Sequence, residues 1–307
     1  MTINTLDELL LFFKAHDLPS YARDSFDKFL KHQKFDFNKK SIHITGTNGK
    51  GSTANYIRQI YIAHGYKVGF YNSPFFYSPL EMIAINNEDI SLEKYLEIFN
   101  NFESSFEEFK LTSFEIQTFI AYKFFMDSDI DIAVIEVGMG GAIDATNILS
   151  NPILAIITSV SLEHTSYLGR TVSEIASSKA GIITKQCNVI IGKLDEDAIY
   201  SIQKVASYTK SMLKIVDDFY NERIIGNNVY FDYGNFKNLI LNTPALYQCK
   251  NASIAIEAVL TLNDYFQIYE EDIRNGLNTK TLNNRFDVFG NVVIDGAHNP
   301  EAMNNLL

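Results

Sequence analysis

The chain has 307 residues, of which 46% are hydrophobic and 21% charged, the ordinary composition of a globular protein with one large α/β domain or two smaller ones. Its formal net charge of −11 argues against nucleic acid as a partner, because positive charge is what binds a phosphate backbone. Two cysteines cannot build a disulfide framework, and neither an apolar run of about 18 residues nor a signal-peptide pattern occurs, so we expect a cytoplasmic protein without membrane contact.

The first predicted elements lead into and out of a glycine-rich loop. Apolar residues at helical spacing predict helices over residues 6–13, 21–33 and 52–64. Residues 41–45 and 67–71 have the pattern of strands, so each strand is preceded or followed by a helix. The loop after the first strand consists of Gly46, Thr47, Asn48, Gly49, Lys50, Gly51, Ser52 and Thr53.

This loop has the composition of a phosphate-binding site. Glycines let backbone N–H groups approach an anion, the following helix offers its positive end, Lys50 adds a point charge, and Ser52 or Thr53 can hold magnesium. The loop is not the common Walker A pattern, because Ile44 stands where that pattern has its first glycine and Gly51 separates Lys50 from Ser52. On these residues alone, a plain strand-to-helix turn remains an alternative.

The next predicted elements alternate between strands and helices. An irregular segment with two prolines covers residues 72–89, and connections of that length are often functional. Helices are predicted at 91–109, 112–126, 172–180, 195–208, 246–262 and 270–277, and apolar strands at 130–137, 153–158, 189–192 and 212–216. The alternation predicts an α/β fold with a doubly wound, mostly parallel sheet, and a period near two over residues 223–241 adds a small antiparallel patch.

The last predicted elements begin another unit. Residues 292–294 have a strand pattern, and after a turn Asn299 and Pro300 suit the N-cap and first position of a helix. A lone strand–turn–helix cannot bury its own apolar faces, so we expect these residues to begin a further unit. The expected division is a phosphate-binding domain at residues 1–284, followed by a linker and the first strand and helix of that further unit at 285–307.

Four polar residues occupy positions where they could carry chemistry. Glu136 closes an apolar strand, and the carboxyl ends of parallel strands border the crevice in which such sheets bind ligands. His164 follows the next strand, Ser73 lies in the segment with two prolines, and Lys179 lies near a helix end. The structural alternatives are a solvated glutamate, a hydrogen-bonded loop histidine, an ordinary loop serine and a solvent-facing lysine.

Three motifs together resemble the Mur ligase superfamily, and most of all its folylpolyglutamate synthase and dihydrofolate synthase branch. The first is the loop Gly-Thr-Asn-Gly-Lys-Gly-Ser at residues 46–52. The second is Glu-Val-Gly-Met-Gly-Gly-Ala-Ile-Asp-Ala-Thr-Asn at 136–147, and the third is Asp-Gly-Ala-His-Asn-Pro at 295–300. The resemblance extends along almost the whole chain. It implies the P-loop central-domain fold of these ligases, with residues 1–284 as their ATP-binding domain and residues 285–307 as the start of a second α/β domain that is truncated at Leu307.

The resemblance implies a role for each candidate residue. The nucleotide would be bound by residues 46–53 together with Asn251, Arg285, Asp295 and His298, and Asp144 would line the substrate site. Mg²⁺ would be held by Ser52, Ser73, Glu136 and His164, although imidazole is an unusual ligand for that ion. The catalytic residues would be Lys50, His164 and Lys179; the lysine matching Lys179 is often carbamylated in the family, and whether Lys179 is modified stays open.

Several positions depart from the family's pattern. Ala142 replaces a family arginine, so an expected positive contact is missing, while Met82 stands where the family usually has arginine and Phe75 where it has histidine; these departures support the alternative of an impaired fragment. Milder departures are Glu163 for aspartate, Ser178 for glutamate and Tyr247 for histidine.

The implied reaction is ATP-dependent amide ligation by a monomer. An acceptor carboxylate would attack the γ-phosphate of ATP, and the amine of L-glutamate would then displace phosphate from the acyl phosphate. Dihydropteroate, a folate or both would be the acceptor. The alternatives are another Mur-type carboxylate–amine ligase and a truncated, catalytically impaired Mg-ATP-binding fragment. A kinase or simple ATPase fits less well, because the motif at 295–300 has no role there.

Overall fold

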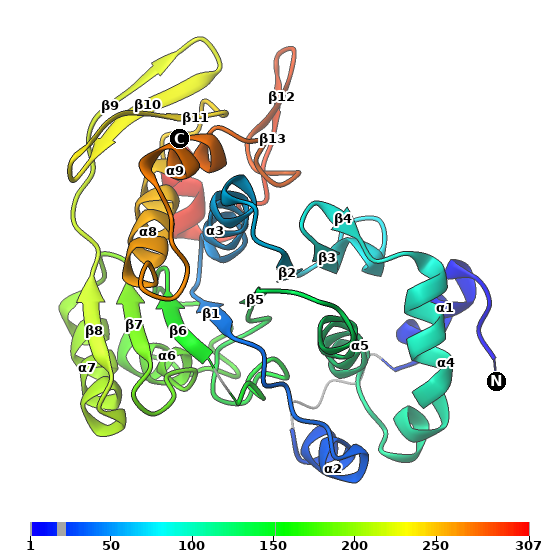
Figure 1. Cartoon of the computed structure of the whole chain (residues 1–307). Coiled ribbons are helices and arrows are strands. Elements are labelled where there is room, and N and C mark those ends of the chain that lie inside the picture. Colours follow the sequence, from blue (N-terminus) through cyan, green and yellow to red (C-terminus); the bar gives the residue numbers. More distant parts are fainter. Residues whose placement is uncertain (1, 17–22, 151, 307) are drawn as a thin grey trace.

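A computed structural model describes residues 2–16, 23–150 and 152–306 of the chain (Figure 1). The predicted start of the second helix at residue 21 and the last residue, Leu307, lie outside the described residues. Within them, the predicted doubly wound α/β fold is confirmed.

The centre of the molecule is an eight-stranded sheet with the strand order β4-β3-β2-β5-β1-β6-β7-β8. The six strands from β2 to β8 run parallel, and β3 and β4 continue the sheet antiparallel. The bounds in this spatial order are Glu88–Asp89, Ile83–Ile85, Val68–Tyr71, Ile132–Glu136, Ser41–Thr45, Pro152–Ile157, Asn188–Ile191 and Met212–Ile215.

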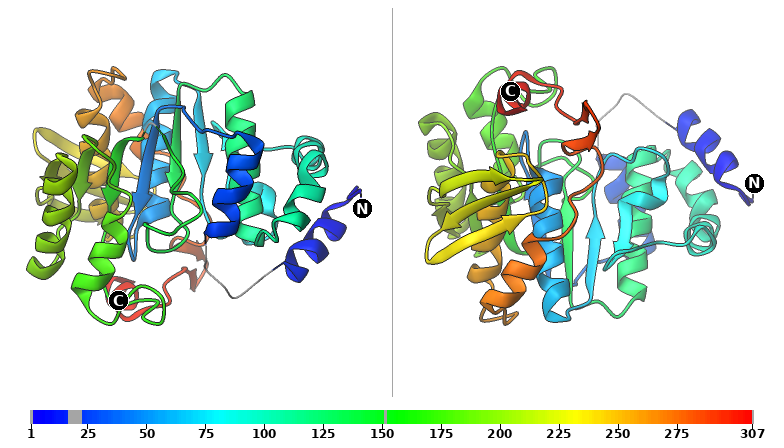
Figure 2. Two further views of the ribbon diagram at one scale, coloured as in Figure 1. Left: turned by 90° about the horizontal axis from the view of Figure 1, so that it is seen from below. Right: turned by 90° about the horizontal axis from the view of Figure 1, so that it is seen from above.

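Helices cover both faces of the sheet, as a doubly wound fold requires (Figure 2). One face carries α3 (Lys50–His64), α8 (Gln248–Thr261) and α9 (Glu270–Leu277). The other face carries α1 (Leu6–Ala15), α2 (Asp24–Gln33), α4 (Leu92–Glu108) and α5 (Ser113–Asp127) at one end, and α6 (Val172–Ala180) and α7 (Glu196–Thr209) at the other. None of the helices in the described part of the chain combines the length and apolar character needed to cross a bilayer.

The central strand β1 is buried on both faces, which explains its lack of a polar side. Ile42 and Ile44 pack into the core under α3 and α8, while His43 and Thr45 point to the opposite face and are also buried. The neighbouring strand β5 divides in the same way, with Val134 in the first core and Ile135 in the second. Two-sided burial is the physical reason for the continuous apolar runs in these strands.

The segment after β2 is more ordered than the sequence predicted. It contains a 3-10 turn at Pro79–Met82 and the short strands β3 and β4, which form a hairpin around Asn86. Asn86 has a positive φ of 54°, a conformation that asparagine tolerates better than most residues. Strands of three and two residues are too short to produce a readable alternation.

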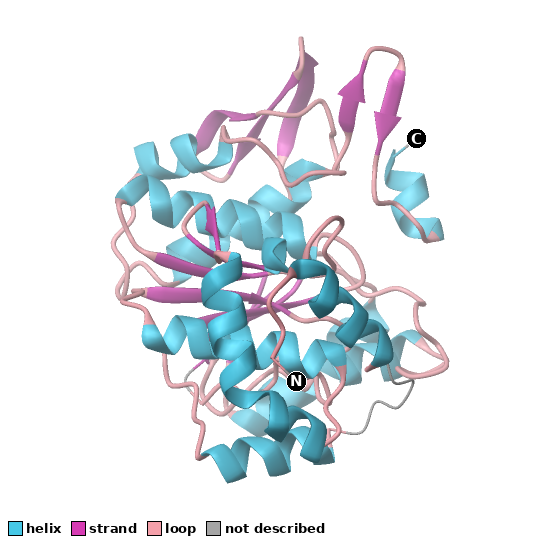
Figure 3. Ribbon diagram, turned by 90° about the vertical axis from the view of Figure 1, so that its right-hand side faces the viewer, coloured by secondary structure: helices cyan, strands magenta, loops and turns pink. Residues whose placement is uncertain are grey.

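Two antiparallel patches lie on the same side of the main sheet (Figure 3). The predicted patch is a three-stranded sheet of β9 (Tyr220–Ile225), β10 (Asn228–Tyr233) and β11 (Phe236–Leu241). Near the C-terminus, the predicted strand β13 (Val292–Ile294) pairs with β12 (Asp287–Phe289), which the sequence did not predict. Asn299 then caps α10 (Pro300–Leu306) by accepting a 2.9 Å hydrogen bond from the Ala302 N–H, as predicted.

Candidate functional site

The glycine-rich loop joins β1 to α3, and its backbone leaves no room for side chains at two of its glycines. A Cβ on Gly46 would lie 1.9 Å from the hydroxyl oxygen of Thr158. Gly49 has a φ of +85°, and a Cβ there would lie 2.3 Å from the side-chain oxygen of Asn251. These glycines therefore let the loop backbone lie directly against Thr158 and Asn251.

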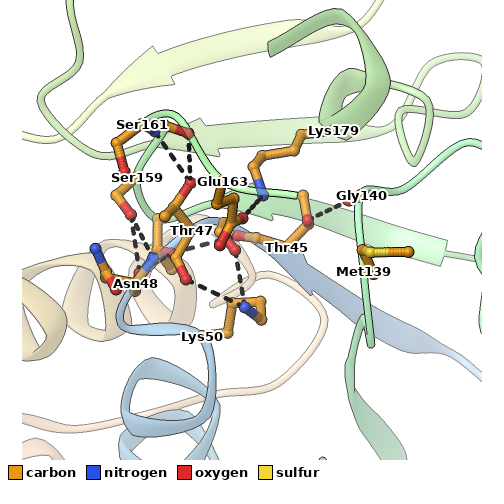
Figure 4. Close-up of polar contacts among 12 residues, drawn as sticks. Thr45, Thr47, Asn48, Lys50, Met139, Gly140, Ser159, Ser161, Glu163 and Lys179 are labelled. Carbon is orange, nitrogen blue, oxygen red and sulfur yellow. Dashed lines mark hydrogen bonds and ion pairs between the residues drawn. The ribbon is translucent and has the colours of Figure 1, made fainter. Parts of the chain in front are cut away.

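The adjacent strand β6 holds this loop in place. Just after β6, the carbonyl oxygen of Ser159 accepts a 2.9 Å hydrogen bond from the Thr47 N–H, and its hydroxyl accepts one of 2.7 Å from the Asn48 N–H (Figure 4). The Thr158 hydroxyl donates to the Asn48 carbonyl at 2.6 Å, and the Ser161 N–H donates to the Thr47 hydroxyl at 3.0 Å. The conformation of the loop is thus fixed by residues more than a hundred positions away.

The Lys50 ammonium folds back over its own loop. It donates to the carbonyl oxygens of Gly46 and Thr47 at 2.9 and 3.3 Å (Figure 4). Its positive charge is therefore held next to the N-terminus of α3, where helix N–H groups also favour an anion.

A cavity of about 720 Å³ opens beside the loop and collects most of the predicted site residues. Its lining includes Thr47, Asn48, Gly49, Lys50, Gly51, Ser52, Ser73, Glu136, His164, Asn251, Arg285, Asp295 and His298. Four predicted residues do not line it, namely Gly46, Thr53, Asp144 and Lys179. Strand order explains the convergence, because β1, β5, β6 and β2 are neighbours and their carboxyl ends meet at one edge.

Glu136 is the last residue of β5 and is only 3% exposed. Its Oε2 accepts a 3.2 Å hydrogen bond from the Ser73 N–H. Burial raises the pKa of its carboxyl, and the nearby charges of Lys50 and Arg285 act in the opposite direction. Glu136 is thus a buried carboxyl at the cavity wall whose pKa is raised by burial, an effect that the positive charges of Lys50 and Arg285 partly offset.

The donor atoms around Glu136 suit a hard cation better than a soft one. In the described part of the chain, no three His, Cys, Asp or Glu side chains gather into a complete metal site. The hydroxyls of Ser52 and Ser73 line the same cavity as Glu136. One carboxylate with hydroxyls is the sparse oxygen set with which Mg²⁺ binds, because that ion keeps waters and substrate phosphate oxygens as its other ligands.

Lys179 lies behind the cavity wall in a buried ion pair. Its ammonium is 1% exposed and 2.7 Å from the Oε1 atom of Glu163 (Figure 4). Burial and the repulsion of Lys50 lower the pKa of Lys179 to about 8, although Glu163 acts to raise it. Burial opposes ionisation of Glu163, but Lys179 and Lys50 outweigh it, and the pKa of Glu163 lies below its usual value.

Asp144 lies beneath the cavity wall rather than in it. Its carboxylate accepts hydrogen bonds from the Met139 N–H at 2.8 Å, the Thr146 N–H at 3.0 Å and the Thr146 hydroxyl at 2.6 Å. The side chain is fully buried, and burial raises its pKa. In this structure Asp144 shapes the loop after β5 and reaches the cavity through Gly138 and Met139, which do line it.

The segment from Arg285 to α10 closes another side of the cavity. Asp295 accepts hydrogen bonds from the Tyr247 hydroxyl at 2.6 Å and from the Phe286 N–H at 2.9 Å. Asn299 donates to the side-chain oxygen of Asn48 at 2.8 Å, and Asn48 donates to Glu301 at 2.9 Å. The C-terminal segment therefore makes direct contact with the phosphate loop.

Comparison with known proteins agrees with this geometry. The family model of the Mur ligase middle domain matches residues 44–259. The chain belongs to the Mur ligase family. It is 35% identical to the folylpolyglutamate synthase of Lacticaseibacillus casei over 285 residues, covering 87% of this chain and 66% of that protein. It is 32% identical to the dihydrofolate synthase/folylpolyglutamate synthase of Escherichia coli over 264 residues, covering 84% of this chain and 61% of that protein. This Mur ligase chain therefore spans a little under two thirds of the length of these relatives.

Solved structures of folylpolyglutamate synthases share the fold of this Mur ligase chain. A complex with AMPPCP and folate superposes with a TM-score of 0.91 and 30% identity, covering 99% of this chain and 79% of that one. The Mycobacterium tuberculosis enzyme in complex with ADP gives a TM-score of 0.89 and 26% identity, with coverages of 98% and 72%.

Sequence analysis missed three residues that support the phosphate loop of this Mur ligase. Ser159 and Ser161 hold Thr47 and Asn48, and Glu163 pairs with Lys179. All three follow β6, and the pairing of β6 with β1 brings them to the loop. The one signal in the sequence was the position of Glu163 directly before His164.

Proposed function

We propose that this chain carries the ATP- and acceptor-binding part of a ligase that joins L-glutamate to dihydropteroate or a folate. The observation that carries the proposal is the common cavity, in which the phosphate loop, Glu136 and the Arg285–His298 segment meet a wall of apolar side chains. The names of the L. casei and E. coli relatives support the same reaction.

The reaction proceeds in two displacements. A carboxylate oxygen of the acceptor attacks the γ-phosphorus of ATP, the bond to the β,γ-bridging oxygen breaks, and ADP leaves. The amine of L-glutamate then attacks the acyl carbon, a carbon–nitrogen bond forms, and inorganic phosphate leaves as the nitrogen loses a proton. Phosphorylation is needed because a free carboxylate has no adequate leaving group.

The chain's own residues bind and orient the phosphates. The Lys50 ammonium exchanges the carbonyl oxygens of Gly46 and Thr47 for phosphate oxygens, and the first N–H groups of α3 bind the same anion. Arg285 adds positive charge from the opposite wall. Lys179 acts from behind the wall, where it neutralises Glu163 beside Thr47.

Mg²⁺ fits the donors that line this cavity. Glu136, Ser73 and Ser52 would hold it through oxygen atoms, and His164 completes the proposed set. The ion would neutralise charge on the phosphates.

The proposal extends to the organisation of the chain. Residues 1–284 form the ATP-binding unit and residues 285–307 a linker with the first strand and helix of another unit. In support, the helices that cover the main sheet end with α9 at residue 277. We further propose that the protein acts as a cytoplasmic monomer on small-molecule substrates.

The test is ADP release by the purified chain with Mg-ATP, acceptor and L-glutamate. Release should require both acceptor and glutamate, and Lys50→Ala should lower the rate by about a hundredfold or more. Lys193→Ala is the matched control, because Lys193 is exposed and pairs with the exposed Asp218 away from the cavity, so its rate should be unchanged. ADP release that is independent of the acceptor would identify an ATPase instead.

A further inference from the structure

A short arm of the chain carries Arg285 to the cavity. It runs from the end of α9 to β12 and rests on the phosphate loop, where a Cβ on Gly51 would lie 3.3 Å from Cδ1 of Leu282. Arg285 follows three residues later and lines the cavity. Among the described residues, no hydrogen bond or ion pair holds its guanidinium, so the backbone of the arm decides where this cation points.

The backbone on both sides of Arg285 has an unusual conformation. Asn284 and Phe286 have positive φ values of 58° and 61°. Asparagine tolerates this left-handed conformation, but a bulky residue such as Phe286 rarely adopts it. Such strain persists only where the surroundings hold the backbone, and it gathers at ligand sites. The hydrogen bonds that hold this turn therefore also hold the direction of Arg285.

The residues that hold the turn are Asp295 and Gly296. Oδ2 of Asp295 accepts a hydrogen bond from the Phe286 N–H at 2.9 Å. The Gly296 N–H donates to the carbonyl oxygen of Asn284 at 2.9 Å. A Cβ on Gly296 would lie 2.1 Å from Nη1 of Arg285, so the guanidinium rests directly on this backbone. Asp295 and Gly296 thus fix both flanks of Arg285.

Tyr247 connects this turn to α8. It is the N-cap residue of α8, but its side chain makes no capping hydrogen bond. Its hydroxyl instead donates to Oδ2 of Asp295 at 2.6 Å. The same end of α8 reaches the phosphate loop, since the Gln248 amide donates to the Ser52 hydroxyl at 3.3 Å. One end of one helix therefore contacts both the phosphate loop and the turn that carries Arg285.

We propose that Tyr247 is a positioning residue for the nucleotide: through Asp295 it fixes the strained turn that directs the Arg285 guanidinium at the phosphates. The inference rests on the proposed function and adds a residue to it. Asp295 then acts on the nucleotide through Arg285 and not by contact, because a carboxylate beside phosphate oxygens repels them. A phenol suits this position, since its O–H donor meets the carboxylate in a charge-assisted hydrogen bond.

The test is a double-mutant cycle on nucleotide affinity, which does not depend on turnover. The 307-residue chain and its variants are titrated calorimetrically with Mg-AMPPCP. Arg285→Ala should weaken binding by about tenfold or more, as the loss of a hydrogen bond from a charged group does. Tyr247→Phe should weaken binding by about fivefold in the native chain, and by less than about twofold when Arg285→Ala is already present.

A hydroxyl with a merely structural role would not depend on Arg285. An equal loss of affinity in both backgrounds, or no loss in the native chain, therefore overturns the inference. Tyr208→Phe is the matched control, because Tyr208 on α7 is 90% exposed and outside the cavity lining. This variant should keep the native affinity.

Asp295→Ala separates positioning from charge, and it keeps the inference testable if Tyr247→Phe does not fold. If charge alone mattered, removing a carboxylate near the phosphates would strengthen binding. The inference requires weaker binding, and only while Arg285 is present. Stronger binding by Asp295→Ala, or a loss that persists in the Arg285→Ala background, contradicts it.

This inference and the ligase proposal fail in different ways. A chain that shows the coupling between Tyr247 and Arg285 but releases no ADP supports the inference and contradicts the ligase proposal. A chain that releases ADP with acceptor and glutamate, and binds AMPPCP equally well without the Tyr247 hydroxyl, supports the ligase proposal and contradicts the inference. Absence of AMPPCP binding by the native chain contradicts both.

Discussion

At the scale of single residues, the site depends on charges that are buried and paired. Glu163 and Lys179 are the clearest case, because Lys179 is almost without solvent contact and Glu163 also accepts a hydrogen bond from Thr47 of the phosphate loop. Removing one partner of such a pair leaves the other charge unpaired in a low-dielectric surrounding. The pair therefore contributes both to the stability of the chain and to the shape of the loop.

We expect Glu163→Gln to lower the free energy of unfolding by about 3 kcal/mol, because it leaves the Lys179 ammonium buried and unpaired. Urea denaturation measures this change. Adding Lys179→Met should recover part of the loss, since the double variant buries no unpaired charge. Asp218→Asn, which breaks an exposed pair with Lys193, should change stability by less than about 0.5 kcal/mol. If Glu163→Gln and Asp218→Asn lowered the free energy of unfolding equally, burial of the Glu163–Lys179 pair would not matter for stability.

His43 on β1 predicts a specific loss of stability in acid. Burial lowers the pKa of His43 from 6.5 to about 3, while its Nε2 contacts the Thr146 hydroxyl and its Nδ1 has no hydrogen-bond partner among the described residues. The unfolded chain therefore binds a proton below pH 6.5 that the folded chain does not bind, so stability should fall by about 1.4 kcal/mol per pH unit from this residue between pH 6.5 and 3.

The measurement is urea denaturation of the native chain and of His43→Gln at several pH values. The free energy of unfolding of the native chain should fall more steeply with falling pH than that of His43→Gln. Stability profiles that stay parallel from about pH 7 to about pH 4.5 would show that His43 does not titrate as burial requires.

At the scale of elements, the turn between β1 and α3 requires glycine for two reasons. The surroundings leave no room for a side chain, and the backbone has a positive φ. Gly49 and Gly65 are the N-cap and C-cap residues of α3, both with positive φ, of 85° and 105°. They differ in their surroundings, because a Cβ on Gly49 would meet Asn251 while one on Gly65 would meet nothing within 4 Å.

This difference separates backbone strain from site geometry. Gly65→Ala should cost about 1–2 kcal/mol of stability and leave AMPPCP affinity unchanged. Gly49→Ala should carry the same strain and also weaken AMPPCP binding by about tenfold, because the added methyl displaces Asn251 and the loop. Titration of both variants with AMPPCP measures the two affinities. Equal affinities would contradict the role of the loop in binding the nucleotide.

What the sequence could predict depended on how local each signal is. The β1–loop–α3 unit and the long apolar strands were predictable, because periodicity and glycine spacing are encoded within about ten residues. The strands β3, β4 and β12 were not, since each is short, lacks the unbroken β-branched run Val-Val-Ile that marked β13, and exists only through its pairing partner. Ser159 and Glu163 were missed for a related reason, as only the pairing of β6 with β1 brings them to the loop.

At the scale of the whole molecule, the cavity joins parts of the chain that the sequence separates widely. Asn48 and Asn299 exchange hydrogen bonds across 251 positions. Glu301 accepts from Asn48 at the same place, so a carboxylate lies beside a loop built for an anion. The segment that closes the cavity therefore also opposes the charge of a bound phosphate.

Glu301→Gln should strengthen AMPPCP binding by about threefold at low salt, since it removes this negative charge while keeping an oxygen that can accept from Asn48. The gain should shrink as salt is raised. Glu271→Gln on the exposed side of α9 is the control and should have no effect on affinity. Weaker binding by Glu301→Gln would mean that the carboxylate supports the nucleotide.

The contact between Asn48 and Asn299 has a consequence for cooperativity. None of the described side chains of α10 is buried, and all three residues of β13 are exposed, so this segment adds little apolar burial to the fold. Its attachment is mainly polar, and such segments open at far lower free energy than a packed core. We therefore expect residues 285–306 to open at a lower free energy than the sheet, and a ligand on the phosphate loop that also contacts this segment to oppose the opening.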